Sequence, residues 1–264
     1  MDLKIQDRVA IITGASTGIG LETAKILADE GARLLLTDQP KTDWSDVGEQ
    51  LSEFQSIEAD LTNQLDCDRV VAEAESKFGG CDILVHTAGI TGEKGHPLEM
   101  SDQAWQEAWD IDFFTAVRMC RAAVPVMRKG SWGRCVFITS ENAVQPYVEE
   151  AVYNCAKASL ECFVKNLSKA EGEHNVLINS VAPAFIKTPM TDGMMQQRAE
   201  ENDVEMEEAI ESFLHEERPG ITANRRGRAE EVASVIALLC SERASFVNGS
   251  NYRVDSGSVM TANY

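Results

Sequence analysis

Long apolar segments are missing from this sequence of 264 residues. No apolar run approaches the roughly 18 residues that a membrane-spanning helix needs, so we expect no transmembrane segment and no membrane partner. Residues 1–6 are polar and do not resemble a secretory signal, which favours a cytoplasmic protein. Repeats and Pro- or Ser-rich linkers are also missing, so we expect one domain over residues 1–264.

Regularly spaced cysteines and histidines are missing as well. The seven cysteines are scattered and none forms a Cys-x-x-Cys pair, which predicts reduced thiols rather than a disulfide framework. The four histidines do not have the spacing of metal ligands, so no metal site is predicted. We expect His86 to lie at a strand end near a cofactor, and His96, His174 and His215 to lie on the surface.

Positive charge is scarce. The chain has 24 basic and 43 acidic residues, a net charge of −19 at pH 7. Such a surface repels nucleic acids, anionic membranes and acidic proteins, so we expect no nucleic-acid partner. The one obvious basic cluster consists of Arg118, Arg121, Arg128 and Lys129.

Strand-like and helical patterns alternate along the chain. Strands are predicted at 8–13, 32–37, 54–59, 82–86, 134–139, 176–181 and 251–254. The longest helical patterns between them cover 102–128 and 150–171. The alternation predicts an α/β fold built from βαβ units, with a parallel sheet whose ligands bind beyond the carboxyl ends of the strands.

Three glycines follow the first predicted strand. Gly14, Gly18 and Gly20 precede a helical pattern over 21–30, which Gly31 ends. Without Cβ atoms the chain can bend tightly and approach a phosphate, and the helix N-terminus supplies free N–H groups. The pattern favours a dinucleotide-binding turn; a glycine-rich connection without a ligand is the alternative.

The second predicted strand ends at Asp38, about twenty residues after the glycine turn. A carboxylate there accepts hydrogen bonds from the ribose hydroxyls of NAD and repels the 2′-phosphate of NADP. Neither Thr17 nor Gln39 is basic, so we predict NAD, although Lys41 is close in the sequence. A solvated acid at the strand end is the alternative.

Three residues in the middle of the chain form the most informative pattern. Tyr153 and Lys157 are one helical turn apart, and Ser140 lies upstream at a predicted strand end. The Lys157 ammonium should lower the pKa of the Tyr153 phenol from its usual value of about 10, so that the phenol can exchange a proton with a substrate. Ser140 would hold the substrate oxygen. An ordinary amphipathic pair is the alternative for Tyr153 and Lys157.

Together these features resemble the short-chain dehydrogenase/reductase family over nearly the whole chain. The matching segments are 13–20, 60–61, 88–89, Ser140, 153–157 and 179–183. The resemblance implies a single-domain Rossmann-type fold, a doubly wound parallel sheet of about seven strands with helices on both faces. It also implies a nicotinamide cofactor, no catalytic metal, and a homotetramer or dimer packed through the two long helices.

The resemblance further implies the residues of the site. Ser140, Tyr153 and Lys157 would be catalytic, and Tyr153 and Lys157 would also contact the cofactor. The remaining cofactor-binding residues would be Gly14, Ser16, Thr17, Gly18, Ile19, Gly20, Asp38, Asp60, Leu61, Thr87, Ala88, Gly89, Pro183, Ala184, Ile186 and Thr188.

The chain departs from the family pattern at a fourth candidate catalytic position. Asp112 stands where the family has a helix asparagine that completes a water-linked proton relay. An ionised carboxylate only accepts hydrogen bonds, and its charge would stabilise the Lys157 ammonium while offsetting the effect of that ammonium on Tyr153. We expect activity to survive; a solvent-facing Asp112 is the alternative. Smaller departures, which bear on loops near the cofactor, are His86, Thr87, Ala184 and Ser256.

The segment 188–220 predicts a mobile helical lid. It contains ten acidic residues and only Arg198 and Arg218 as bases. Its apolar side chains could form an inner face, although packing on the core alone is the alternative for each. They are Met190, Met194, Met195, Met206, Ile210, Phe213 and Leu214. A neutral or weakly polar secondary alcohol or ketone fits such a lid best.

The sequence therefore predicts an NAD-dependent alcohol dehydrogenase. Two alternatives stay open at this point. One is an NADPH-dependent 3-oxoacyl thioester reductase, and the other is an NAD-binding regulator that has lost catalysis.

Overall fold

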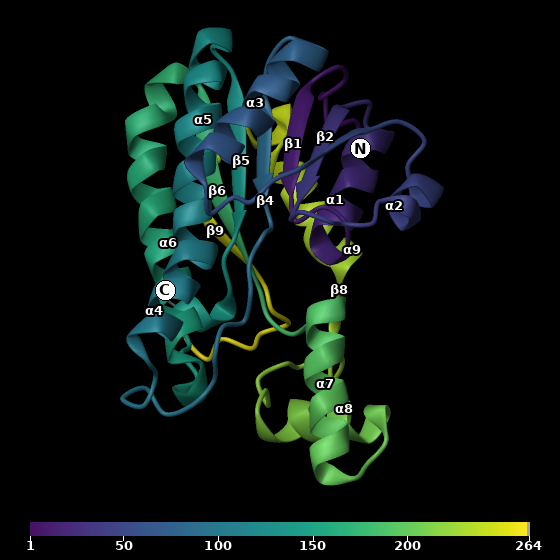
Figure 1. Cartoon of the computed structure of the whole chain (residues 1–264), viewed down its shortest axis with the longest axis vertical. Helices are drawn as coiled ribbons and strands as arrows, with labels where there is room; N and C mark the ends of the chain where they lie inside the picture. The colour runs from purple at the N-terminus through teal and green to yellow at the C-terminus, as the bar shows by residue number, and fades with distance from the viewer. Residues whose placement is uncertain (263–264) are drawn as a thin grey trace.

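The computed structural model describes residues 1–262 and is built around one parallel sheet (Figure 1). Its strands are β1 (Val9–Thr13), β2 (Arg33–Asp38), β3 (Gln55–Glu58), β4 (Ile83–His86), β5 (Gly133–Ile138), β6 (Val176–Pro183) and β9 (Asn251–Val254). They lie in the order β3-β2-β1-β4-β5-β6-β9. The seven predicted strands are thus confirmed, and the order reverses between β1 and β4, where a crevice opens at the carboxyl ends.

Apolar side chains of the central strands alternate between the two faces of the sheet. In β2, Leu34 and Leu36 join one core cluster, whereas Leu35 joins the other. Strands buried on both faces need continuous apolar runs, which explains why the sequence pattern located them. The Rossmann-type, doubly wound fold with two covered faces is therefore confirmed.

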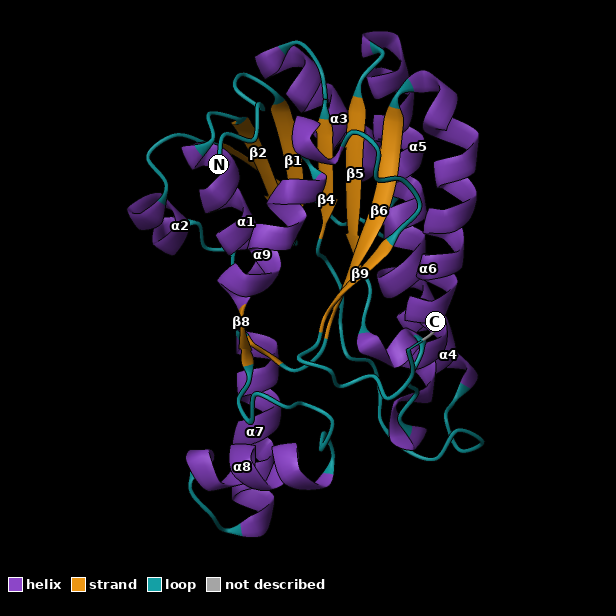
Figure 2. Ribbon diagram, turned by 180° about the vertical axis from the view of Figure 1, so that it is seen from behind, coloured by secondary structure: helices purple, strands orange, loops and turns teal. Residues whose placement is uncertain are grey.

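Helices cover both faces of the sheet (Figures 1 and 2). On one face, α1 (Gly18–Asp29) packs against α9 (Ala229–Leu239), and α2 (Ser45–Gln50) lies near the β2 edge. On the other face lie α3 (Gln64–Phe78), α5 (Thr115–Gly130) and α6 (Ala151–Glu171). No helix among residues 1–262 is long and apolar enough to cross a membrane.

The predicted helix over 102–128 is interrupted. It consists of α4 (Asp102–Trp109), a π-helical turn (Asp110–Phe114) and α5. A π-turn inserts one extra residue into the helical register, so the predicted segment is helical throughout but not α-helical throughout. Asp112 lies in this turn and is buried, with 1% exposure.

The segment 188–220 forms a helical pair that projects beyond the carboxyl end of the sheet (Figure 2). It contains α7 (Pro189–Asn202) and α8 (Met206–Glu216). A two-stranded parallel ribbon of β7 (Ile186–Lys187) and β8 (Gly227–Arg228), which the sequence did not predict, connects it to the main body. The pair has a small core of its own, formed by Phe185, Met195, Phe213, Leu214 and Ile221.

Candidate active site

A cavity of about 510 Å³ lies at the carboxyl end of the sheet, between the main body and α7. Every candidate catalytic and cofactor-binding residue named from the sequence lines this cavity. The candidates come from segments far apart in the chain, and the fold brings them together because the carboxyl ends of parallel strands meet at one edge.

The glycine turn leaves the first N–H groups of α1 open to the cavity. No side chain caps this helix end, and its first turn contains no acid. Gly14 has a φ of +62°, and a Cβ atom on it would lie 2.9 Å from the backbone nitrogen of Ala88. Gly20 has no room for a Cβ either, because Gly14 O and Thr87 Oγ1 crowd it. Free donors and a close backbone fit a bound pyrophosphate.

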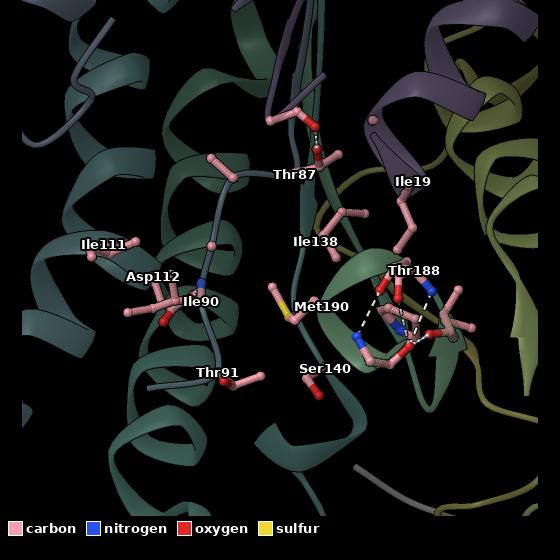
Figure 3. Close-up of a pocket in the computed structure, with 18 of the residues that line it drawn as sticks. Ile19, Thr87, Ile90, Thr91, Ile111, Asp112, Ile138, Ser140, Thr188 and Met190 are labelled. Atoms are coloured by element: carbon pink, nitrogen blue, oxygen red, sulfur yellow. Dashed lines mark hydrogen bonds between the residues drawn. The ribbon is translucent and has the colours of Figure 1, made fainter. Parts of the chain in front are cut away.

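The loop after β4 is fastened over the glycine turn. Thr87 Oγ1 donates to the carbonyl oxygen of Thr13 at 2.6 Å, and Ala88 N donates to Thr13 Oγ1 at 3.3 Å. Figure 3 shows Thr87 on this side of the cavity, across from Ile19 of α1. The hydrogen bonds fix the width of the opening between β1 and β4.

Asp38 stands at the rim of the same opening, at the end of β2. Its Oδ2 accepts hydrogen bonds from Ser16 N at 3.1 Å and Ser16 Oγ at 2.7 Å, and its Oδ1 accepts one from Gln39 N at 2.9 Å. These bonds hold the carboxylate against the glycine turn. Among the described residues that line the cavity, only Lys157 and Arg218 are basic.

His86 lies at the end of β4, as expected, next to Thr87 of the cavity wall, but it does not line the cavity itself. It is 1% exposed, and its Nδ1 and Nε2 lie 3.0 Å from Thr13 Oγ1 and Thr115 Oγ1. Burial, together with the nearby Lys157 ammonium, lowers the pKa of His86 to about 3. The neutral ring therefore links β1 and α5 through hydrogen bonds. The other three histidines are exposed, as expected.

Ser140, Tyr153 and Lys157 lie together where β5 ends and α6 begins. Ser140 Oγ donates to Asn142 Oδ1 at 3.1 Å and caps a short 3₁₀ turn. Lys157 Nζ lies 5.5 Å from the centre of the Tyr153 ring and donates to Ile138 O at 3.2 Å. The helical spacing thus places the ammonium beside the phenol.

The pKa of Tyr153 differs from the sequence-based expectation. Burial of the phenol raises its pKa, and the Asp112 carboxylate adds to the rise. The Lys157 ammonium acts in the opposite direction, as expected, and so does hydrogen bonding between Tyr153 and Ser140, but together they do not outweigh burial. Without ligands the phenol is therefore held in its protonated form.

Asp112 forms a buried ion pair with Lys157. Its Oδ1 lies 3.2 Å from Lys157 Nζ and accepts a hydrogen bond from Ile90 N at 3.1 Å, so it does not face solvent (Figure 3). Burial alone would lower the pKa of Lys157, but Asp112 and Tyr153 outweigh it and the pKa is raised. Burial raises the pKa of Asp112, opposed by Lys157. Asp112 Oδ2 is buried without a hydrogen-bond partner.

A second charged cluster lies beyond Ser140, and sequence reasoning did not assign it to the site. Arg218 Nε lies 3.4 Å from Glu141 Oε1, and Arg218 Nη2 lies 3.4 Å from Glu150 Oε2. The guanidinium stacks 3.3 Å above the Tyr147 ring. All but Tyr147 line the cavity. Two signals were available: Glu141 directly follows Ser140, and Arg218 is a rare base in an acidic segment.

Apolar side chains close the remaining sides of the cavity. Met190 and Met194 of α7 and Phe213 of α8 line it from the helical pair, opposite Ile90. In Figure 3, Met190 lies between the Ile90 segment and Thr188. Met195 and Leu214, which the sequence also placed on an inner face, instead pack in the core of the helical pair.

Comparisons with known proteins agree with this geometry. A family model described as enoyl-(acyl carrier protein) reductase matches residues 14–259. The 3-oxoacyl-[acyl-carrier-protein] reductase of Aquifex aeolicus is 32% identical over 262 residues, covering 97% of this chain and 99% of that protein.

Two solved structures show the same architecture over the full chain. L-sorbose reductase from Gluconobacter frateurii, complexed with NADPH and L-sorbose, has a TM-score of 0.93 and 33% identity, covering 99% of this chain and 100% of that one. The ligand-free aldohexose dehydrogenase of Thermoplasma acidophilum has a TM-score of 0.87 and 27% identity, covering 100% and 98%.

The buried state of His86 predicts a pH dependence of stability. Its folded-state pKa of about 3 lies below the usual value near 6.5, so only the unfolded chain takes up the proton between these values. Stability contributed by neutral His86 is therefore present above pH 6.5 and is lost as pH falls. In urea unfolding, the free energy of unfolding of the wild type should fall between pH 7 and pH 5.5, and His86→Asn should make this fall smaller by about 1 kcal/mol.

The exposed His215 provides the matched control for this measurement. His215→Asn should keep the pH dependence of the wild type. If the free energy of unfolding of His86→Asn depended on pH as steeply as that of the wild type, the interpretation of His86 as a neutral buried ring would be contradicted.

Proposed function

The chain belongs to the short-chain dehydrogenase/reductase family, and from this premise we propose that it transfers a hydride between NAD(H) and a neutral or weakly polar secondary alcohol or ketone. The observation that carries the proposal is the common cavity. It is lined at once by Ser140, Tyr153, Lys157 and the open end of α1 at Gly18.

A bound nicotinamide would supply or accept the hydride. Tyr153 gives the proton to the substrate oxygen in reduction and takes it in oxidation, and the Ser140 hydroxyl donates a hydrogen bond to the same oxygen. The Lys157 ammonium stabilises the phenolate whenever it forms. A positioned acid–base group of this kind contributes about 10²–10⁴-fold in rate. Because burial raises the pKa of Tyr153, the resting enzyme holds the proton that carbonyl reduction needs.

The finer assignment of the cofactor as NAD is supported by Asp38. Its carboxylate, which Ser16 holds against the glycine turn, would repel the 2′-phosphate of NADP. Both basic residues of the cavity wall belong to the region around Tyr153 and Ser140, so they do not compensate this repulsion. The related L-sorbose reductase was solved with NADPH, so this point needs its own test.

A 3-oxoacyl thioester reductase is the second candidate, because the curated relatives include enzymes of that name. Such a substrate arrives on an acidic carrier protein, and the basic cluster on α5 is the obvious place to receive it. Arg118 and Arg128 of this cluster are already paired with Asp110 and Glu171. This favours a free small-molecule substrate.

We also propose a cytoplasmic homotetramer or dimer that packs through α5 and α6, with residues 188–220 acting as a substrate lid. Phe114 at the start of α5 and Cys155 and Cys162 on α6 are exposed in the isolated chain, which suits a shared surface. All seven cysteines are free, as a reducing compartment requires.

The function is tested by screening alcohols and ketones for NADH fluorescence changes, with Tyr153→Phe as the comparison. Loss of the phenolic proton should lower kcat by about 10²–10⁴-fold while NADH still binds. Full turnover by Tyr153→Phe would contradict the proposal. Tight NADH binding without turnover by the wild type would favour the regulator, and turnover of acetoacetyl thioesters with NADPH alone would favour the thioester reductase.

Replacement of Asp38 tests the choice of cofactor. Asp38→Asn removes the negative charge and weakens the acceptor for the ribose hydroxyls, so kcat/KM for NADP relative to NAD should rise about 10–100-fold. Asp60→Asn changes another carboxylate of the cavity wall and should leave this ratio unchanged. An unchanged ratio in Asp38→Asn would show that NADP selection has a different origin.

Replacement of Asp112 tests its electrostatic effect on the phenol. Since Asp112 raises the pKa of Tyr153, Asp112→Asn should lower that pKa. Alcohol oxidation requires the ionised phenol, so the acidic limb of its pH–rate profile should move to lower pH, with activity retained. Movement to higher pH, or a complete loss of turnover in a folded variant, would contradict the assigned role.

A further inference from the structure

Glu141 places a buried carboxylate next to the serine that would hold the reacting oxygen. It is 1% exposed, lines the cavity and directly follows Ser140 at the end of β5. Burial raises the pKa of Glu141, although the Ser258 hydroxyl, the Arg218 guanidinium and Tyr147 oppose this. A carboxylate so far removed from water is costly unless each of its oxygens has a partner.

The two oxygens of this carboxylate are not equally satisfied. Oε1 lies 3.4 Å from Arg218 Nε, whereas Oε2 is buried and makes no hydrogen bond. The nearby Ser258 Oγ is likewise buried and unpaired, so the two groups lie close without a bond of normal geometry between them. Buried polar atoms without partners are rare in native proteins, and each calls for a partner that the chain does not supply, such as a water or a ligand group.

The neighbouring Glu150 does not share this deficit. It receives hydrogen bonds from Lys94 Nζ at 2.8 Å, Asn142 Nδ2 at 2.6 Å and Arg218 Nη2 at 3.4 Å. These contacts outweigh burial and lower the pKa of Glu150. Glu141 is therefore the carboxylate of this cluster that retains capacity to accept a hydrogen bond.

The chemistry of the missing group follows from the charges. An acceptor oxygen of a carboxylate requires a donor, which excludes ethers and carbonyls at this point. A carboxylate or phosphate on the substrate would be repelled by Glu141 and Glu150. An ammonium bound to Glu141 Oε2 would lie next to the Arg218 guanidinium, whose Nε is 3.4 Å from Oε1 of the same carboxylate. A neutral hydroxyl remains, and it must be a second one because Ser140 and Tyr153 are assigned to the reacting oxygen.

We propose that Glu141 is a specificity-determining residue and that the substrate is a polyhydroxylated alcohol or ketone, such as a sugar or polyol, whose hydroxyl near the reacting carbon donates to Glu141. This inference rests on the proposed function and deepens it. Arg218 is a positioning residue: it follows α8, stacks on Tyr147 and fixes Oε1, which leaves Oε2 for the substrate.

The test compares reduction of a panel of ketohexoses with that of 2-hexanone, which lacks the additional hydroxyls. The wild type should favour its best ketohexose in kcat/KM. Glu141→Leu leaves the substrate hydroxyl without an acceptor, so the ketohexose-to-hexanone ratio should fall about 10–100-fold, chiefly through KM. Glu141→Gln retains an acceptor oxygen and should restore part of the ratio.

A matched control is Glu171→Gln. Glu171 is also a buried carboxylate paired with an arginine, Arg128, but it does not line the cavity. Glu171→Gln should lower thermal stability without changing the ketohexose-to-hexanone ratio of kcat/KM. Calorimetric titration of a ketohexose into Tyr153→Phe loaded with NADH gives a second readout, which should weaken when Glu141→Leu is added.

The outcomes separate the two proposals. The role of Glu141 would be overturned, while the proposed function stands, if kcat/KM fell equally for both substrates in Glu141→Leu. A wild type that prefers 2-hexanone would have the same meaning. Turnover of neither substrate and no calorimetric binding would contradict the proposed function and this inference together.

Discussion

The buried pair of Lys157 and Asp112 is the interaction on which the rest of the site depends. Lys157 is 4% exposed, and its ammonium is stable there only because Asp112 Oδ1 and Ile138 O are both 3.2 Å away. The same carboxylate accepts the hydrogen bond of Ile90 N and leaves no space for a Cβ atom on Gly89. One ion pair therefore fixes α6, the end of β5, the loop after β4 and the π-turn relative to one another.

The cavity contains two kinds of buried carboxylate with different consequences. Asp112 is paired with a lysine of the main body and shapes the electrostatics of the phenol. Glu141 is paired with Arg218 of the segment that also supplies α7 and α8. The orientation of Glu141 thus depends on the position of the helical pair, whereas that of Asp112 does not. The proposed recognition of a substrate hydroxyl would thus be linked, through this single guanidinium, to the position of the helical pair.

Much of the fold follows from local sequence signals, and the exceptions have physical reasons. Apolar runs located the central strands β1, β2, β4, β5 and β6, because strands covered on both faces require them. The edge strands β3 and β9 contain mostly exposed or half-buried residues and have no such run. The glycine turn was located because close backbone contacts restrict residue types at Gly14 and Gly20, and Asp38 because it ends a strand that the sequence predicted. The π-turn at 110–114 left no comparable signal, since one inserted residue barely alters an apolar pattern of period 3.6. The net pKa of Tyr153 depends on burial, which is set by the complete fold.

The cluster around Arg218 shows why long-range ion pairs escape sequence analysis and what they add. Arg218 is far from Glu141 and Glu150 in the chain, and no spacing rule connects them. The reason for its position becomes clear only from the charges inside the cavity, where one guanidinium pairs with both carboxylates. Glu150 has a second partner in Lys94, whereas Glu141 keeps one oxygen without a hydrogen bond. A neutral hydroxyl that donates to this oxygen of Glu141 would add no charge to the cavity. An anionic ligand would bring a further negative charge next to Glu141 and no hydrogen-bond donor. The proposed recognition would therefore select substrates by hydrogen-bond donation rather than by charge.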